Sequence, residues 1–174
     1  MEQCNADPSA IDLYLEGFGL LARRAVELDQ ATDEDGQSLL HLVAKQGPAE
    51  FIDILINLGL DLNGLERRSR TPSFVTVLEG RSTVLDRLIK FQADLNKADE
   101  DGDTPLIIAA MDGKLAISLL LSKGADMDYQ KRDLWTPMHL SACWGHGEVV
   151  RLLLEKGANP NQVTNEGETS LHLA

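Results

Sequence analysis

Three residues close together in the sequence have side chains that suit nucleophilic or metal chemistry: His139, Cys143 and His146. A thiol becomes a nucleophile when a neighbouring base takes its proton, and imidazole and thiolate are both common zinc ligands. Cys143 directly precedes Trp144-Gly145, however, and the sequence offers neither an acid to orient a histidine nor an oxyanion-binding motif around it. We therefore predict no catalytic residue here and interpret the placement of Cys143 as chance.

Acidic residues form the pattern Asp-x-Asp-Gly at two places, 33–36 and 99–102. Carboxylates at this density are typical of calcium loops, but a calcium loop also needs further ligands at fixed spacing and a terminal Glu, which are missing. We expect solvated turns in which an Asp side chain caps the backbone. Cys4 and Cys143 form neither a paired metal motif nor a disulfide framework, which agrees with a reducing compartment. The sequence therefore predicts no metal site and no cofactor.

The surrounding sequence repeats about every 33 residues, and this period decides how these side chains are positioned. Two copies read Gly-Asp-Thr-Pro-Leu-Ile-Ile-Ala-Ala at 102–110 and Trp-Thr-Pro-Met-His-Leu-Ser-Ala at 135–142. Thr before Pro favours the start of a helix, because the hydroxyl caps the first turn and Pro fixes φ at a helical value. The Thr position recurs in steps of 33, 33, 32 and 33 residues, at Ser38, Thr71, Thr104, Thr136 and Thr169.

Each copy continues with a second apolar segment at helical spacing, for example over 51–58 and 149–154. Glycine accepts the left-handed backbone that often ends a helix, and it follows three of these segments, at Gly59, Gly124 and Gly157. Two short helices cannot enclose a core by themselves. The units must therefore stack to bury a continuous apolar seam.

This pattern resembles the ankyrin-repeat family, whose units carry Thr-Pro-Leu-His-x-Ala and end in Gly-Ala-Asp-x-Asn, to which Gly-Ala-Asp-Met-Asp at 124–128 is similar. The resemblance implies an all-α repeat solenoid of stacked helix-turn-helix units with hairpin-like loops, in one domain over 1–174. We expect the chain to be a fragment of a longer protein. Its expected units are a degenerate N-terminal repeat or cap at 1–32, repeats at 33–65, 66–98, 99–130 and 131–163, and the truncated start of a further repeat at 164–174.

The resemblance gives the histidines a structural role. His41, His139 and His172 share one repeat position, which in ankyrin repeats holds a framework histidine that ties helix to loop by hydrogen bonds, and His146 matches the family's Gly-His pair. Equivalent positions of neighbouring units lie about 8–10 Å apart, too far to share a metal held at about 2 Å. We therefore expect these side chains to hold the fold.

Two turns lack the glycine that other units have, for example at Gly36 and Gly102: Ser69 and Leu134 stand in its place. A leucine is strained in a backbone with positive φ. We expect a reshaped loop at Leu134, with Leu134 and Trp135 presented at its edge.

Charge and composition exclude several classes of protein. The net charge of −12 argues against binding to nucleic acid or to anionic membranes, because such binding requires Lys and Arg. No apolar run approaches the about 18 residues of a membrane span, and the N-terminal segment lacks the pattern of a signal peptide. We expect a monomeric, cytoplasmic protein without membrane insertion, and secretion as an effector stays open.

In the ankyrin family, partners contact the hairpin tips and the exposed positions near the end of each first helix. Applied position by position, this rule selects a strip that runs from acidic through basic and acidic to aromatic residues. Trp and Arg are the side chains most often responsible for binding hot spots. The partner-binding residues predicted in this way are Arg67, Arg68, Arg70, Glu100, Asp101, Asp103, Met111, Asp112, Arg132, Asp133, Trp135 and Trp144.

The resemblance implies a non-catalytic protein-interaction module or scaffold, which holds a protein partner with a basic or mixed-charge surface in its concave groove. A fold does not name a partner, and two alternatives stay open. The chain can be the regulatory or targeting segment of a larger enzyme, channel or bacterial effector. It can also bind a nucleotide or small ligand, whose phosphate would meet the arginines at 67–70. We do not expect an enzyme.

Overall fold

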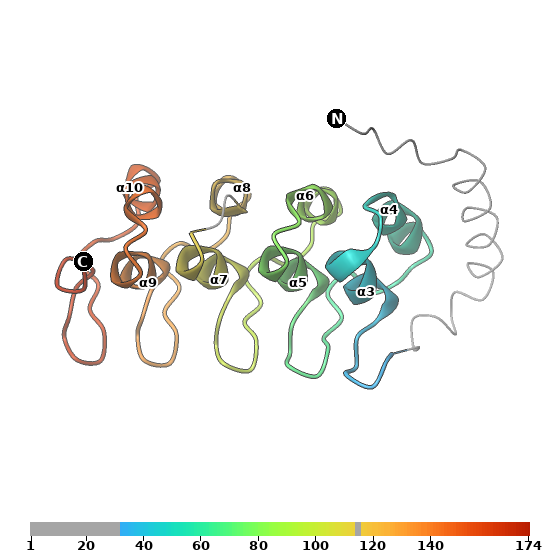
Figure 1. Cartoon of the computed structure of the whole chain (residues 1–174), viewed down its shortest axis with the longest axis horizontal. Coiled ribbons are helices and arrows are strands. Elements are labelled where there is room, and N and C mark those ends of the chain that lie inside the picture. Colours follow the sequence, from blue (N-terminus) through green and yellow to red (C-terminus); the bar gives the residue numbers. More distant parts are fainter. Residues whose placement is uncertain (1–31, 114–115) are drawn as a thin grey trace, which may run out of the picture.

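The computed structural model describes residues 32–113 and 116–174, and the helices of this part of the chain alternate between two rows (Figure 1). The first row holds α3 (Leu39–Gln46), α5 (Pro72–Leu78), α7 (Pro105–Met111) and α9 (Pro137–Cys143). The second row holds α4 (Glu50–Asn57), α6 (Ser82–Lys90), α8 (Ala116–Ser122) and α10 (Gly147–Glu155). No strand occurs among the described residues, and the predicted all-α repeat solenoid is confirmed. The N-terminal cap predicted at 1–32 lies, up to residue 31, outside the described residues.

The first-row helices α5, α7 and α9 start where Thr-Pro predicts them. The Thr71 hydroxyl accepts the backbone N–H of Phe74, and Pro72 occupies the first turn of α5. Thr104 and Thr136 cap α7 and α9 in the same way. The hydroxyl thus satisfies one of the N–H groups that the first turn of a helix leaves without a partner.

The buried side chains form a seam that runs from one helix pair to the next. Ile52 of α4, Leu85 of α6 and Leu153 of α10 are fully buried, each on the inner face of its helix. Because α7 packs against both α5 and α9, the core of one pair is completed by its neighbours. The long loops project beyond the first row, away from the second (Figure 1).

The Asp-x-Asn type endings connect neighbouring units through side chains. In each case a side-chain oxygen of one unit accepts a backbone N–H of the next unit. The predicted turn residues thus also fix the spacing between neighbouring units. The three pairs have lengths of 2.8–2.9 Å and join Asn63 to Asp94, Asn96 to Asp126, and Asp128 to Asn159.

His41 and His139 are framework residues, as predicted. The Nδ1 atom of His139 accepts the backbone N–H of Thr136 at 3.1 Å, so the proton lies on Nε2, which donates to the Gln162 carbonyl at 3.1 Å. His41 bridges in the same way to the Arg70 carbonyl, at 2.9 Å. Each ring thus ties the start of a first-row helix to a loop, which confirms the structural role and explains why both rings are buried.

A second connection runs from the start of a second-row helix back to the preceding unit. The Arg81 guanidinium donates to the Val43 carbonyl at 2.7 Å and also to the Gly47 carbonyl. His146 occupies the same repeat position as Arg81, and its Nε2–H donates to the Met111 carbonyl at 2.8 Å. The Gly47 and Met111 carbonyls lie at the C-terminal ends of α3 and α7, where a helix runs out of N–H groups for its last carbonyls, whereas the Val43 carbonyl also accepts the Gly47 N–H at 2.9 Å.

Ser69 and Leu134 adopt the left-handed backbone of the glycines they replace, with φ of 60° and 62°. The Leu134 N–H donates to the Lys131 carbonyl at 2.9 Å, as the Gly102 N–H does to the Asp99 carbonyl at 3.0 Å. The expected reshaping of this loop is therefore wrong. The turn keeps its form because the surrounding structure holds the strained backbone in place. Leu134 does lie at the edge, and 38% of it is exposed.

Leu134→Gly should have a free energy of unfolding about 1 kcal/mol higher than Leu134→Ala, because glycine adopts a positive φ without the strain of a Cβ atom. Both variants lose the packing of a side chain that is 38% exposed, so their comparison isolates the strain. Urea unfolding measures the difference. Equal stabilities of the two variants would contradict the role of strain.

Burial lowers the pKa of His41 below its ordinary value of 6.5 and outweighs the opposite effect of the hydrogen bond to the Arg70 carbonyl. The unfolded chain then takes up a proton near pH 6.5 that the folded chain does not bind. The stability contributed by neutral His41 is complete above this pH and is lost as the pH falls toward the lower folded-state pKa, by at most about 1.4 kcal/mol per pH unit.

His41→Gln should therefore flatten the dependence of the unfolding free energy on pH between about pH 7 and about pH 5. Urea unfolding at a series of pH values gives the two slopes. Carboxylates titrate in both proteins, so the difference between the slopes reports His41. Parallel profiles would show that His41 does not contribute.

Candidate functional site

The hairpin tips and the C-terminal ends of the first-row helices share one side of the molecule, which we call the loop-side face. A hollow of about 330 Å³ lies on this face where the α3 and α5 units meet. Helix-end residues Lys45, Leu78 and Glu79 line it together with the tip residues Arg67 and Arg68. The structure thus brings together the predicted contact positions of two neighbouring units.

Arg68 connects two neighbouring hairpin tips. Its Nε atom lies 2.8 Å from Glu100 Oε1, and its Nη2 atom lies 2.7 Å from Asp101 Oδ2. The hydrogen bond that Arg68 donates to Glu100, helped by the charge of Asp101, raises the pKa of Arg68. All three side chains remain about half exposed, so solvent screens the pair and its contribution to stability is small. The contacts of Arg68 with Glu100 and Asp101 orient the two tips, and they neutralise part of the basic charge of one tip and of the acidic charge of the next.

Arg70 also lines the hollow, and its side chain reaches the neighbouring hairpin, with 17% of it exposed. Its Nε atom lies 3.3 Å from Asp99 Oδ2, whose side chain is only 1% exposed, and its guanidinium lies 5.2 Å from the centre of the Phe74 ring. The other Asp99 oxygen accepts the backbone N–H groups of Asp101 and Asp103, each at 3.0 Å. Arg70 and Asp99 therefore hold the hairpin from within.

Arg67 differs from the other two arginines. It is exposed, its backbone N–H donates to the Asp35 carbonyl at 2.9 Å, and within residues 32–113 and 116–174 its guanidinium forms no ion pair. The basic cluster of the sequence thus separates into Arg67, which is exposed, Arg68, which is exposed but paired, and Arg70, which is half-buried and paired. That the three bind a partner stays a prediction.

The acidic turn at 99–103 is less exposed than expected. Asp103 is buried, with Oδ1 2.6 Å from Lys131 Nζ, and Asp99 is buried against Arg70. The expectation of a solvated turn is therefore wrong for Asp99 and Asp103, because basic side chains from both neighbouring hairpins cover these two carboxylates. The expected capping by an Asp is present at Asp99, and Glu100 and Asp101 are exposed. The expectation holds for Asp33, which is exposed and caps the backbone of its own turn.

Ion pairs between neighbouring units were missed by the sequence reasoning. Arg68 and Glu100 lie 32 residues apart, and Arg87 of α6 pairs with Asp53 of α4, 34 residues earlier. Opposite charges about one repeat apart are the signal that points to such pairs. Reading the charges along each hairpin alone hides this signal.

Apolar side chains follow one another along the loop-side face. Leu78, Met111 and Cys143 occupy the same repeat position, at the ends of α5, α7 and α9, and Trp144 comes next in the chain. Leu78 and Cys143 are exposed, Met111 is half-buried, and 61% of Trp144 is exposed. We call these four residues the apolar row.

Charged residues border the apolar row. Glu79 and Asp112 are exposed and directly follow Leu78 and Met111 in the chain. Two acidic residues thus lie beside the first two residues of the row.

The tip of the α9 unit combines charges with an aromatic ring. Arg132 and Asp133 are exposed there. Trp135 is half-buried, with its ring centre 6.2 Å from that of His139 and the planes inclined by 55°. Trp144 is therefore the more accessible of the two tryptophans.

Among residues 32–113 and 116–174, no three His, Cys, Asp or Glu side chains come together as metal ligands. None of the helices described has the length and apolar character that crossing a membrane requires.

Known proteins match the chain along much of its length. A family model described as ankyrin repeats (3 copies) matches residues 73–164 and 135–174. The E3 ubiquitin-protein ligase KEG of Arabidopsis thaliana is 30% identical over 147 residues, which cover 83% of this chain and 7% of that protein. Rabankyrin-5 of Homo sapiens is 51% identical over 45 residues, or 26% of this chain and 4% of that protein.

A shorter relative shows the same partial coverage. The probable 26S proteasome regulatory subunit p28 of Saccharomyces cerevisiae is 42% identical over 62 residues, or 33% of this chain and 27% of that protein. The chain thus spans less than a third of the length of each of these three relatives.

Arg70→Gln should lower the free energy of unfolding by about 2–3 kcal/mol, because it leaves the buried Asp99 carboxylate without its cation. Arg68→Gln is the matched control in the same hairpin and should change stability little, since its ion pairs are exposed. Urea unfolding compares the two variants. Equal effects of both would contradict the assignment of Arg70 to the framework.

Proposed function

Because the chain belongs to the ankyrin-repeat family, we propose that it is a non-catalytic protein-interaction module that holds a segment of a protein partner along its loop-side face. Ankyrin repeats are protein-interaction modules, and stacking gives them a long rigid surface. The apolar row carries the proposal. Apolar side chains that lie exposed in register on a surface otherwise rich in charge are typical of an interaction site.

The spacing of the apolar row favours an extended partner segment. Packed helices lie about 8–10 Å apart, which corresponds to about three residues of extended chain. An extended segment with an apolar side chain at about every third residue therefore fits the positions of Leu78, Met111 and Cys143. Trp144 adds a large exposed surface at one end, and tryptophan is frequent among hot spots.

The charges beside the row favour a partner with basic residues. Glu79 and Asp112 are exposed at its border, and the chain as a whole carries a net charge of −12. Lys or Arg residues between the apolar positions of the partner would meet these carboxylates. Such rim charges set the register and the association rate more than the affinity.

A second function is compatible with the first: the chain serves as the regulatory or targeting segment of a larger protein. The lengths of the relatives favour it, since this chain covers only 4–27% of the three proteins described above. The small-ligand alternative has less support, because Arg68 and Arg70 already pair with carboxylates. A cytoplasmic location and a monomeric state belong to the same proposal.

Trp144→Ala should weaken binding of a partner peptide by about 2 kcal/mol, or roughly 30-fold. The probes are peptides selected from a random displayed library against the wild-type chain, and calorimetry measures their affinity. We expect the selected peptides to combine apolar with Lys or Arg residues. Leu154→Ser is the matched control, because it changes an exposed apolar residue of α10 that lies outside the apolar row.

Equal affinities of Trp144→Ala and wild type, with unchanged helical content by circular dichroism, would remove the apolar row from the proposal. The association rate tests the acidic residues beside the row separately from the affinity. Glu79→Gln combined with Asp112→Asn should slow association at low salt, and the difference should vanish at high salt because exposed charges are screened there.

A further inference from the structure

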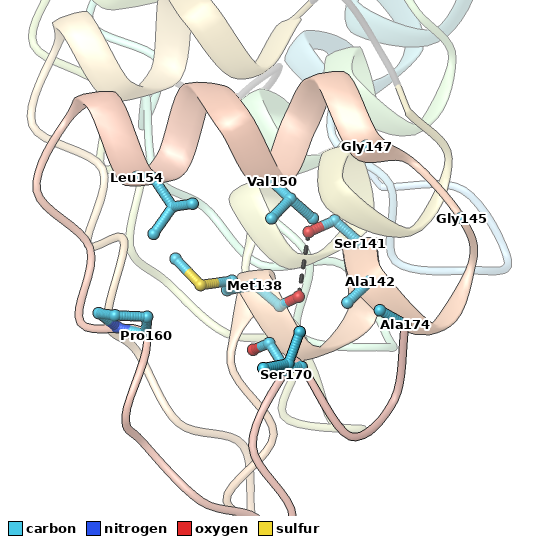
Figure 2. A pocket seen from close by; sticks show the side chains of 11 residues that line it. Met138, Ser141, Ala142, Gly145, Gly147, Val150, Leu154, Pro160, Ser170 and Ala174 are labelled. Atoms are coloured by element: carbon cyan, nitrogen blue, oxygen red, sulfur yellow. Dashed lines mark hydrogen bonds between the residues drawn. The ribbon is translucent and has the colours of Figure 1, made fainter.

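Two hollows of the structure differ in their chemistry. The hollow of about 440 Å³ beside α9 and α10 is lined by apolar side chains such as Met138, Val150 and Leu154 (Figure 2). The hollow of about 330 Å³ between the α3 and α5 units is lined mainly by charged side chains, and we call it the charged hollow. The charged hollow can therefore recognise charge in a partner, and its available side chains decide of which sign.

Three of the charged side chains in this lining already have partners. Glu66 Oε1 accepts the backbone N–H groups of Arg68 and Arg70, at 3.0 and 3.2 Å. The guanidinium groups of Arg68 and Arg70 pair with carboxylates of the next hairpin, at 99–101. These three residues thus hold the hairpins in place and leave the recognition of a partner to the rest of the lining.

Lys45 and Arg67 are the cations of the charged hollow that lack such partners. Both are exposed, and in the part of the chain that the structure describes neither forms an ion pair. Asp35 and Glu79 also line the hollow, but no ion pair joins either of them to the two cations within that part of the chain. Two positive charges are thus available to an anionic group, although the chain as a whole carries a net charge of −12.

Lys45 stands at the repeat position of the apolar row. Equivalent residues near the ends of the first-row helices are Lys45 in α3, Leu78 in α5, Met111 in α7 and Cys143 in α9. From α3 to α9 this position therefore changes from a cation to apolar side chains. A partner segment that lies along the row meets Lys45 one unit before it meets Leu78.

The surroundings of the two cations strengthen an ion pair formed there. Arg67 lines the charged hollow from the hairpin tip, where its N–H donates to the Asp35 carbonyl at 2.9 Å, and Lys45 lines it from the last turn of α3. Val75 and Leu78 add apolar surface to the lining. Apolar walls reduce the screening of a charge by solvent, so a carboxylate held in the hollow binds more strongly than on an open surface.

We infer that the charged hollow is the subsite for an acidic side chain of the partner segment, whose carboxylate pairs with Lys45 and Arg67; this inference rests on the proposed function. Neighbouring units lie about 8–10 Å apart, or about three residues of extended chain. The Asp or Glu of the partner therefore stands about three residues from the apolar residue at Leu78, on the side away from the residue at Trp144.

The subsite also fixes the direction in which the partner segment lies along the row. A segment bound in the reverse direction would place its apolar end on the two cations and its carboxylate beside the exposed ring of Trp144. Both contacts would leave a charge without a partner, which disfavours the reversed complex.

The test selects peptides from a random displayed library against the wild type and against a variant with Lys45→Glu and Arg67→Glu. We expect Asp or Glu at one end of the apolar pattern for the wild type, and Lys or Arg at the same place for the variant. By calorimetry, a peptide selected on the wild type should bind the variant about tenfold more weakly or worse, because both ion pairs become repulsive. Exchange of its acidic residue for Lys should restore the affinity for the variant.

Lys97→Glu combined with Lys156→Glu is the matched control. It changes the net charge by the same amount at exposed positions outside both hollows. Since exposed charges are screened beyond about 8 Å at physiological salt, the selected pattern and the affinity should stay as in the wild type. Circular dichroism checks that both variants keep the helical content of the wild type.

Three results would overturn the inference. A selected pattern without an acidic residue, or the same pattern for wild type and variant, would remove the subsite but leave the proposed function in place if Trp144→Ala still weakens the peptides. Lys or Arg selected at this end by the wild type would show that Asp35 and Glu79 decide the sign of the hollow. Peptides that bind Trp144→Ala as well as the wild type would contradict the proposed function, and the subsite with it.

Discussion

Each helix pair in this chain leaves an apolar face and several backbone carbonyls that only a neighbouring pair can cover. Leu85 and Ile117 are buried because a neighbouring unit packs over them, and the carbonyls at the ends of α3 and α7 receive Arg81 and His146 from the following unit. Two short helices alone could not satisfy either requirement. The stacking of units is therefore the condition on which the core, the loop positions and the binding face depend.

The dependence on neighbours also decides what the charged residues do. Arg70 with Asp99, and Lys131 with Asp103, join neighbouring hairpins through largely buried pairs. Burial of such groups is tolerated when each charge has a close partner. These residues fix the hairpins, while Arg67 and the residues of the apolar row stay accessible. A rigid loop array and an accessible face thus arise from the same hairpins.

The sequence predicts the fold well because its signals are local. Thr71 and Pro72 start a helix wherever they occur, and the framework histidines act within one turn and one adjacent loop. The loop at Leu134 was predicted wrongly, since strain alone argued for a reshaped turn, whereas hydrogen bonds of the surrounding hairpin hold φ at 62°. The sequence predicted the candidate face as a set of repeat positions, but it did not predict which of its arginines are paired with carboxylates.

From the sequence alone, the helix starts follow from residues within one unit, the repeat length from comparing the copies, and the framework histidines and the family from the resemblance. Which side chains are available follows from the tertiary structure. Arg67 and Arg70 lie three residues apart, yet one reaches solvent and the other reaches Asp99 of the next hairpin. Leu121 and Leu154 share one repeat position, yet only one is covered. Exposure and pairing depend on the neighbouring unit, which a single repeat of sequence does not contain.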